Sequence, residues 1–487
     1  MKSENAERNR WIVLTIVCMA QFMVILDATI VNVALPSIQR GLHFTTANLQ
    51  WVINAYTLVF GGFLMLGGRA ADLAGRRKLF LAGLILFSGA SLLNGLSSSS
   101  TMLIGGRALQ GLGGALVSPA ALSIVTTTFT DQGERTKALG IWSAIAAGGS
   151  AAGLLLGGVL TSLASWQWVF FVNVPVGAVT VLLALKAVPE SHAEVEERSV
   201  DLGGAFTVTA GLVAIVYGIV KAQAWGWGSE KTLGTLAVGV LLLVAFVIIE
   251  GRHRAPLMRL GLFKMRTLSG ANVAMLLVAA GLFGLFFFLS LYLQDILGYS
   301  ALKAGFAFLP FTVMVGVGAA LSQQLLKRFN PRDVTAGGVI LAAAGMVILS
   351  RVPIHGSYLA HILPGILPLS AGMGLAFVPI TLLATGGVSH QDAGQASAMV
   401  NTAQQIGGAL GLAILSTIAV DHTAGAVKKL GAHPLPTALI QARVDGYHTA
   451  FLVAAGMLVL AAVALAAFMR KRHLDGIEYD QSKLVVA

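Results

Sequence analysis

The stretch Trp11–Pro36, WIVLTIVCMAQFMVILDATIVNVALP, decides the fold of this chain, and Asp27 is its only charged side chain. About 20 mostly apolar residues suffice for a helix to cross the hydrocarbon core of a bilayer. Lipid offers no hydrogen-bond partner to a peptide group, so a run of this length predicts a transmembrane helix. The run is too long for a signal peptide and lacks a small-residue cleavage site, so we expect it to be retained.

Similar apolar runs recur along the rest of the chain. The 487 residues are 56% hydrophobic and 11% charged, whereas soluble domains carry about 25% charged residues. The runs are too continuous for the alternating strands of a membrane barrel. We therefore predict an all-α integral membrane protein with fourteen transmembrane helices. Their expected ranges are 11–36, 48–68, 79–97, 101–127, 136–162, 166–187, 202–221, 232–250, 269–293, 302–325, 335–351, 358–385, 394–420 and 447–470.

The basic residues are distributed unevenly between the two sets of loops. With the N-terminus placed in the cytoplasm, the cytoplasmic segments hold 23 Lys and Arg residues and the outer loops hold 8. Arg107 lies within a predicted helix and completes the total of 32. Because Lys and Arg are enriched in cytoplasmic loops, we predict a multi-pass protein of the bacterial cytoplasmic (inner) membrane with both termini inside. The same distribution explains the net charge of +11 as topology, so we expect membrane lipid around the protein and no nucleic-acid partner.

Two parts of the chain resemble each other. Asp72–Leu86, DLAGRRKLFLAGLIL, aligns with Lys327–Leu341, KRFNPRDVTAGGVIL, and Gly113–Pro119, GGALVSP, aligns with Met373–Pro379, MGLAFVP. Weak internal symmetry of this kind is typical of duplicated transporter halves. The predicted organisation is a six-helix bundle over 1–187, a linker with two extra helices over 188–268, a second six-helix bundle over 269–472 and a short cytoplasmic tail over 473–487.

Two ionisable side chains lie deep within predicted helices. Asp27 follows Trp11 by 16 residues, which places it about 24 Å from the inner end of its helix. Arg107 lies roughly 8 Å from the outer end of the fourth helix by the same rise. Both therefore fall in the outer half of the membrane, where they can pair directly or through water. An ionisable residue within a membrane is a functional candidate by default.

Two interpretations of Asp27 remain open. Burial raises the pKa of a carboxyl group and a neighbouring arginine lowers it, so a movement that changes either influence changes proton occupancy. Asp27 would then take up and release a proton during transport. The alternative is a static ion pair that fixes helix packing.

Small and polar residues form stripes on two further helices. Arg107, Gln110, Gly111, Gly114 and Ser118 fall within about 100° of one face of the fourth helix, so this stripe faces protein or a cavity. In the fifth helix, small residues four apart allow close packing between helices, and a pivot between halves needs such a contact. A nucleotide-binding loop is excluded because these glycines follow no strand and lack a Lys-Ser/Thr pair. The fifth-helix glycines are Gly149, Gly153, Gly157 and Gly158.

The short cytoplasmic loop Gly68–Lys78, GRAADLAGRRK, is dense in charges of both signs. Asp72 beside Arg76 and Arg77 suggests a charge cluster that holds one conformation. The alternative is that the basic residues only set the topology. That alternative does not explain why Asp72 and the glycines occur in this loop.

Together these motifs resemble the major facilitator superfamily, and within it the fourteen-helix drug:proton antiporters of the EmrB/QacA type. The resemblance covers the whole chain. LDATIVNVALP, Leu26–Pro36, is similar to the first-helix motif of that branch, with Asp27 in the acidic position. The loop between helices two and three matches the superfamily motif at Gly68, Asp72, Gly75, Arg76 and Arg77.

The fourth and fifth helices extend the resemblance. Two departures are Leu154, where the antiporter motif usually has proline, and Gln167, where the branch usually has arginine. The fourth-helix motif matches at Arg107, Gln110, Gly111, Gly113, Gly114 and Ala115, and the antiporter motif matches at Gly140, Gly149, Gly153, Gly157 and Gly158.

The resemblance implies a fold of two pseudo-symmetric six-helix bundles that rock to give alternating access. It implies export of drugs or amphipathic, often cationic, small molecules in exchange for protons, without a cofactor, and the direction of transport rests on it alone. An envelope partner protein is compatible with such exporters, although this sequence does not encode one. A dedicated exporter of one metabolite, such as a self-made antibiotic, remains the alternative.

Polar and aromatic residues within the predicted helices are candidates for a substrate cavity. Aromatic faces attract flat or cationic molecules, but for any single phenylalanine a packing or lipid-facing role is the favoured alternative. The candidates are Asn32, Asn54, Tyr56, Phe283, Phe287, Asn401 and Gln405.

The sequence gives no support for an enzyme or a metal protein. Its histidines stand singly, and none forms a spaced ligand set with carboxylates. We expect the longest outer segment, 421–446, to be a loop that acts as a lid or a tether.

Overall fold

The computed structural model describes residues 2–192, 199–253, 256–388, 392–431 and 434–469. Within these ranges, fourteen helical segments are long and apolar enough to cross a membrane. The prediction of an all-α protein with fourteen membrane-spanning helices is thereby confirmed. The predicted tail, 473–487, lies outside the described residues.

The first bundle comprises the helices up to residue 187. Helix α1 packs against α5, α6 and α8, and α5 packs against α3 and α4. The bundle consists of α1 (Lys2–Gly41), α2 (Thr46–Leu49), α3 (Trp51–Ala74), α4 (Arg76–Gly95), α5 (Ser100–Thr128), α6 (Gln132–Leu163), α7 (Trp168–Phe171) and α8 (Asn173–Ala187).

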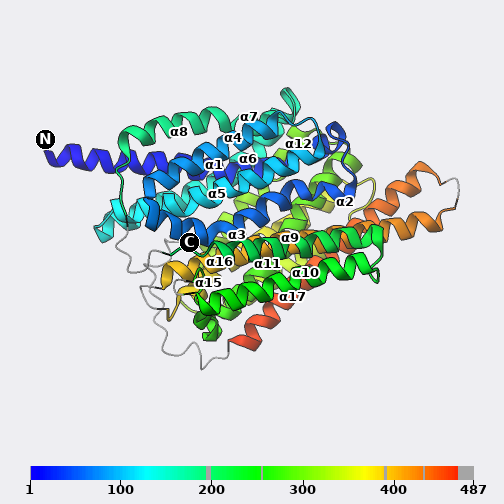
Figure 1. Ribbon diagram of the computed structural model, residues 1–487. Helices are drawn as coiled ribbons and strands as arrows, with labels where there is room; N and C mark the ends of the chain where they lie inside the picture. The colour runs from blue at the N-terminus through cyan, green and yellow to red at the C-terminus, as the bar shows by residue number, and fades with distance from the viewer. Residues whose placement is uncertain (1, 193–198, 254–255, 389–391, 432–433, 470–487) are drawn as a thin grey trace.

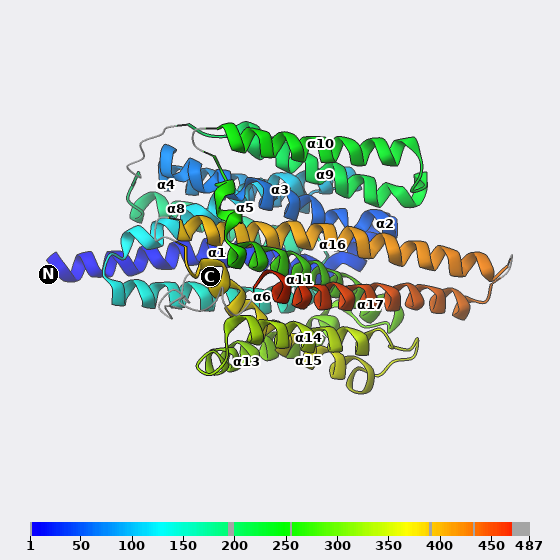
Figure 2. The same cartoon turned by 90° about the horizontal axis from the view of Figure 1, so that it is seen from below.

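A helical hairpin, α9 (Leu202–Trp225) and α10 (Glu230–Arg252), follows the first bundle. Helix α9 packs on α10, on α3 and on α16 of the second bundle, so the hairpin lies against both bundles. Figure 2 shows it at one edge of the molecule, opposite to α13–α15.

The second bundle begins after a short 3-10 helix. Helix α11 packs against α16 and α17, and α15 packs against α13 and α14. The elements are η1 (Leu260–Lys264), α11 (Arg266–Leu291), η2 (Tyr292–Ile296), α12 (Ala301–Ala307), α13 (Leu309–Leu325), α14 (Pro331–Leu349), η3 (Tyr358–Ile362), α15 (Leu363–Thr385), α16 (Ala393–Lys429) and α17 (Pro436–Phe468).

One expectation from the sequence was wrong. Instead of a loop over 421–446, the structure continues α16 to Lys429 and begins α17 at Pro436, so this segment is mostly a helical hairpin that extends past the other helices (Figure 1). Hydropathy indicates only which residues contact lipid. A helix can continue into water where its residues have a high intrinsic helix propensity.

The two bundles contact each other closely at the end of the molecule away from the start of α1, which we call the distal end. The opposite end is the terminal end. At the distal end α1 meets α11 and η2 through their backbones and side chains. Ser290 Oγ donates to Asn32 O at 2.7 Å, Gln294 Nε2 donates to Val33 O at 2.9 Å, and Arg40 Nη1 pairs with Asp295 Oδ1 at 3.2 Å.

A second distal contact joins α6 to α12 through glycines. A Cβ atom at Gly158 would lie 2.7 Å from Ala301 O, and one at Gly305 would lie 2.7 Å from Leu154 O. Both distances are shorter than real Cβ contacts. Only glycine therefore permits this approach of the two bundles.

We expect Gly158→Val to separate the distal ends, because its side chain has no space against Ala301. Spin labels at the exposed positions Leu163 and Leu359, in a Cys18→Ser background, measure this separation. Their distance distribution should move to longer values in Gly158→Val.

The matched control is Gly140→Val in the same helix, where an added Cβ meets nothing within 4 Å. It should leave the distribution as in the wild type. An unchanged distribution in Gly158→Val would show that the α6–α12 contact does not limit the distance between the bundles.

Candidate functional site

The deep acid and the deep base predicted from the sequence form an ion pair. Asp27 of α1 is 0% exposed and Arg107 of α5 is 1% exposed. Arg107 Nη1 lies 2.5 Å from Asp27 Oδ2. Neither side chain reaches solvent, so each charge depends on the other for compensation.

The second oxygen of Asp27 is also fully used. Gln110 Nε2 donates to Asp27 Oδ1 at 2.7 Å, and Asn173 Nδ2 donates to the same oxygen at 2.9 Å. With Arg107, three groups donate to this carboxyl group. An ionised carboxylate only accepts hydrogen bonds, so the arrangement suits the charged form.

Polar groups of α4 complete this network. Ser91 Oγ accepts from Gln110 Nε2 at 3.2 Å and from Asn173 Nδ2 at 3.0 Å, and it donates to Phe170 O at 2.8 Å. Asn94 Nδ2 donates to Gln110 Oε1 at 2.7 Å. The site thus draws on α1, α4, α5, α7 and α8, all in the first bundle.

Arg107 keeps further partners besides Asp27. Its Nε donates to Val52 O at 3.0 Å and its Nη1 donates to Gln110 Oε1 at 2.8 Å. The guanidinium carbon lies 4.3 Å from the centroid of the Tyr56 ring. Such a ring face stabilises a cation, most strongly where water is excluded.

Sequence reasoning missed three members of the network, namely Ser91, Asn94 and Asn173. Asn173 stands in the segment Trp166–Gly177, WQWVFFVNVPVG, where a buried amide among apolar residues was the available signal. Ser91 and Asn94 are three residues apart in α4 and so share a helix face. Nothing in the sequence distinguishes that pair from ordinary packing.

The charged loop at the terminal end is fixed by the segment that follows α8. Gly75 adopts φ 109°, which only glycine accepts readily. Arg76 Nη2 pairs with Asp72 Oδ1 at 3.2 Å, and Arg77 N donates to Glu190 Oε1 at 3.1 Å. Arg77 Nη2 also donates to Leu185 O.

The glycines of the fourth-helix motif bring α5 onto α3. A Cβ at Gly111 would lie 2.4 Å from Tyr56 O, and one at Gly114 would lie 3.0 Å from the Phe60 ring. This close approach brings the Tyr56 ring over Arg107.

Most of the antiporter-motif glycines contact α1. Gly149 faces Ile25, Gly153 faces Thr29, and Gly157 faces Ile30 O, while Gly158 faces the second bundle. Gly140 has no neighbour for a Cβ within 4 Å. The predicted stripe therefore divides its contacts between α1 and α12.

The candidate cavity residues do not form one group in this conformation. Asn54 and Tyr56 are buried in α3, and Phe287 is buried in α11 against Phe288. Gln405 faces Gly61 across the boundary between the bundles. Asn32 donates to backbone oxygens of its own helix, Phe283 covers Gly408, and Asn401 is exposed.

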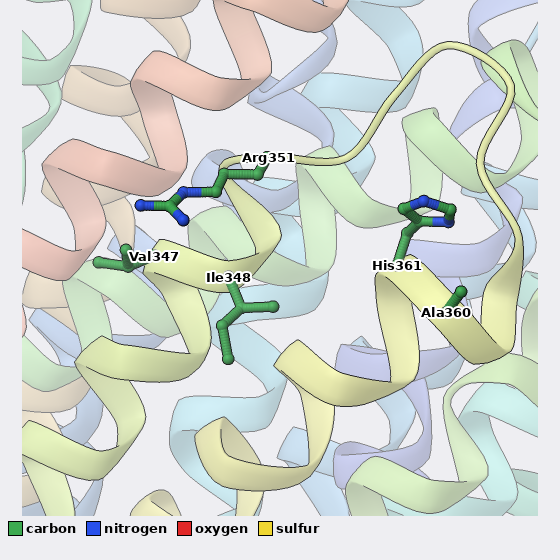
Figure 3. A pocket seen from close by; sticks show the side chains of 5 residues that line it. All are labelled: Val347, Ile348, Arg351, Ala360 and His361. Atoms are coloured by element: carbon green, nitrogen blue, oxygen red, sulfur yellow. The ribbon is translucent and has the colours of Figure 1, made fainter.

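A small pocket of about 250 Å³ lies elsewhere, between the end of α14 and η3 (Figure 3). It is lined by Val347, Ile348, Arg351, Ala360 and His361. Ligand sites usually enclose roughly 300–1,000 Å³, and this pocket shares no residue with the Asp27 network.

Comparison with known proteins now identifies the family. The model of the Major Facilitator Superfamily matches residues 17–412. The chain belongs to the major facilitator superfamily. Membership in this superfamily of transporters confirms both the resemblance drawn from the sequence and the predicted fold class.

Two relatives and one solved structure illustrate the similarity. The puromycin resistance protein pur8 of Streptomyces alboniger is 42% identical over 94% of this chain and 91% of its own length. The cephamycin export protein CmcT of Amycolatopsis lactamdurans is 41% identical over 86% and 87%. The crystal structure of a bacterial homologue of the human lysosomal transporter Spinster has a TM-score of 0.67 and 18% identity, covering 96% of this chain and 98% of that one.

We expect Arg107→Met to destabilise the protein, because it leaves Asp27 as a buried charge without its cation. Breaking a buried ion pair on one side costs about 3–5 kcal/mol. The double variant Asp27→Leu/Arg107→Met should recover most of this loss, since it removes both charges. Thermal unfolding followed by intrinsic fluorescence in detergent measures the three proteins.

Gln110 and Asn173 still lose an acceptor in the double variant, which accounts for a residual loss of about 1–3 kcal/mol. If Arg107→Met unfolds at the wild-type temperature, Asp27 and Arg107 do not compensate each other's charge. A double variant no more stable than Arg107→Met would lead to the same conclusion.

Proposed function

We propose that this protein exports antibiotics or other amphipathic small molecules from the bacterial cytoplasm in exchange for protons, by alternating access of its two bundles. The observation that carries the proposal is the buried Asp27–Arg107 pair within the Asp27 network. We place both termini in the cytoplasm, as the Lys and Arg distribution favours, so the distal end faces outward.

The relatives support the direction of transport. Puromycin resistance protein pur8 is named for resistance and CmcT is named for export, and both align with more than four fifths of this chain. Both relatives are more than 40% identical to this chain over the matched length. Export is therefore the direction we propose here.

The geometry at Asp27 supports proton coupling. Its carboxylate accepts from three donors, which come from α5 and α8. Protonation removes the negative charge that pairs with Arg107 and turns one carboxyl oxygen into a donor, so the contacts around Asp27 must rearrange when a proton is held there. A shift of α1 relative to α5 and α8 is the movement that changes these contacts.

Arg107 tolerates this exchange. When Asp27 is neutral, Val52 O, Gln110 Oε1 and the Tyr56 ring still face the guanidinium group. Its charge is then partly compensated by dipoles and by the ring face. Arg107 thus maintains the site, while Asp27 changes its protonation.

Helix α1 links this chemistry to the distal contact. Asn32 and Val33 lie five and six residues beyond Asp27, roughly 8–9 Å along the helix. Their carbonyl oxygens accept the hydrogen bonds from Ser290 and Gln294 of the second bundle. A shift of α1 that frees Asp27 also disturbs the contact that holds the bundles together at the outer face.

A dedicated exporter of a single compound is the second candidate function. It is favoured by the names of the two relatives, each of which refers to one compound. The resemblance to multidrug antiporters favours a broader range instead. A panel of substrates distinguishes the two: a single transported compound supports the dedicated exporter.

The proposal predicts that Asp27→Asn abolishes proton-driven export, because an amide cannot take up a proton at this position. Everted vesicles with a pH-sensitive dye report substrate-induced proton release, with puromycin and cationic dyes as the first substrates. We expect the signal to fall at least about tenfold, to the level of vesicles without the protein.

Asp421→Asn is the matched control, since Asp421 contacts Trp227 at the distal end far from the site. It should transport as the wild type does. Full proton-driven export by a correctly inserted Asp27→Asn protein would refute the role of Asp27.

A further inference from the structure

Two buried carboxyl groups face each other at the terminal end of the α9–α10 hairpin, outside the Asp27 network. Asp201 precedes α9 and Glu250 lies in the last turn of α10, and each is 3% exposed. Figure 2 shows this hairpin at the edge of the molecule, beside α3 and α16. The two acids meet where the chain enters and leaves the hairpin.

One oxygen of each group already has a partner. Asp201 Oδ1 accepts from Gly204 N at 2.7 Å and caps α9. Glu250 Oε2 accepts from Met258 N at 3.2 Å. These bonds orient both carboxyl groups.

The remaining oxygens converge on one point. Asp201 Oδ2 and Glu250 Oε1 are buried and have no hydrogen-bond partner among the described residues. A Cβ at Gly204 would lie 2.6 Å from the first and 3.0 Å from the second. The absence of a side chain at Gly204 therefore leaves a small space that both oxygens face.

Two carboxylates that face one small buried space repel each other when both are ionised, unless a proton or a cation compensates their charge. Among the described residues, the charged groups that act on Glu250 are Asp201 and His253, which caps the end of α10. A proton held between the two free oxygens satisfies both with one hydrogen bond. It also reduces two like charges to one.

The segment bound to Glu250 connects the hairpin to the second bundle. Beside Met258, Leu257 O accepts from Gln395 Nε2 of α16 at 2.8 Å, and Arg259 Nη1 pairs with Asp392 at 2.7 Å. Leu257 also packs with Leu66 of α3 and Ala205 of α9. The Asp201–Glu250 pair therefore lies beside a contact that includes residues of both bundles.

We propose that Asp201 and Glu250 form a second protonation site, which takes one proton between Asp201 Oδ2 and Glu250 Oε1 and thereby holds residues 257–259 against α16. Loss of that proton leaves two facing carboxylates, whose repulsion releases Met258 and its neighbours from α16. This inference is independent of substrate identity and of the role proposed for Asp27.

The test uses the purified full-length protein in lipid nanodiscs, in an Asp27→Asn, Cys18→Ser background that removes the other deep acid and the native thiol. A fluorophore on Gly261→Cys, quenched by Gly394→Trp in α16, reports docking of the segment on α16. Infrared difference spectra across the same pH range report the protonated carboxyl group. We expect quenching and the carboxyl band to be lost together as the pH rises.

Glu250→Gln should remain docked at every pH, because its amide donates to Asp201 as the shared proton does, and the carboxyl band should be absent. Asp201→Asn keeps a side chain that caps helices well, and we expect it to lose the pH-dependent step as well. This second variant tests the proposal if Glu250→Gln does not fold. Glu230→Gln, at the exposed start of the same helix, is the matched control and should titrate as the background protein does.

Three outcomes would overturn the proposal. The first is quenching that does not change with pH in the background protein. The second is a carboxyl band and a pH-dependent step that persist in Glu250→Gln and Asp201→Asn. The third is docking that responds to Na⁺ or Mg²⁺ at constant pH, which would make the pair a metal-cation site.

Discussion

A hydrocarbon core offers no hydrogen-bond partner, and the internal structure of this protein follows from that constraint. The backbone satisfies it by forming helices across the whole membrane-spanning region. The buried side chains satisfy it by clustering, so that Asp27 and Arg107 share one network with Gln110 and Asn173. Because each member needs the others, the network fixes the relative positions of α1, α5 and α8.

Close packing of glycines supplies what the hydrophobic effect cannot provide between helices in lipid. Gly153 and Gly157 bring α6 onto α1, and Gly158 brings the same helix onto α12 of the second bundle. Such surfaces are smooth and make few specific bonds. The hydrogen bonds that Asn32 O and Val33 O accept from the second bundle add specific contacts to these surfaces. The distal contact therefore combines an adaptable surface with a few bonds that define one state.

Buried acids occur at two separate places among the described residues, at Asp27 and at the pair Asp201 and Glu250. The Asp27 network is enclosed within the first bundle, and α1 connects it to the distal contact. The pair Asp201 and Glu250 lies at the terminal end and adjoins α3 and α16 through Leu257 and Gln395. Both arrangements place a titratable group beside a contact between bundles.

The sequence by itself determined the helix count, the depth of Asp27 and Arg107 and the glycine motifs, because length, hydropathy and spacing are local properties. It failed at residues 421–446, where hydropathy ends at the lipid but α16 continues to Lys429. Only the tertiary structure decided that Asn173 and Ser91 join Asp27, and that Asp201 faces Glu250. These contacts depend on how helices rotate and cross, which is set by packing between residues distant in sequence. The sequence shows which polar residues are present, but it does not show how the helices rotate to bring those residues together.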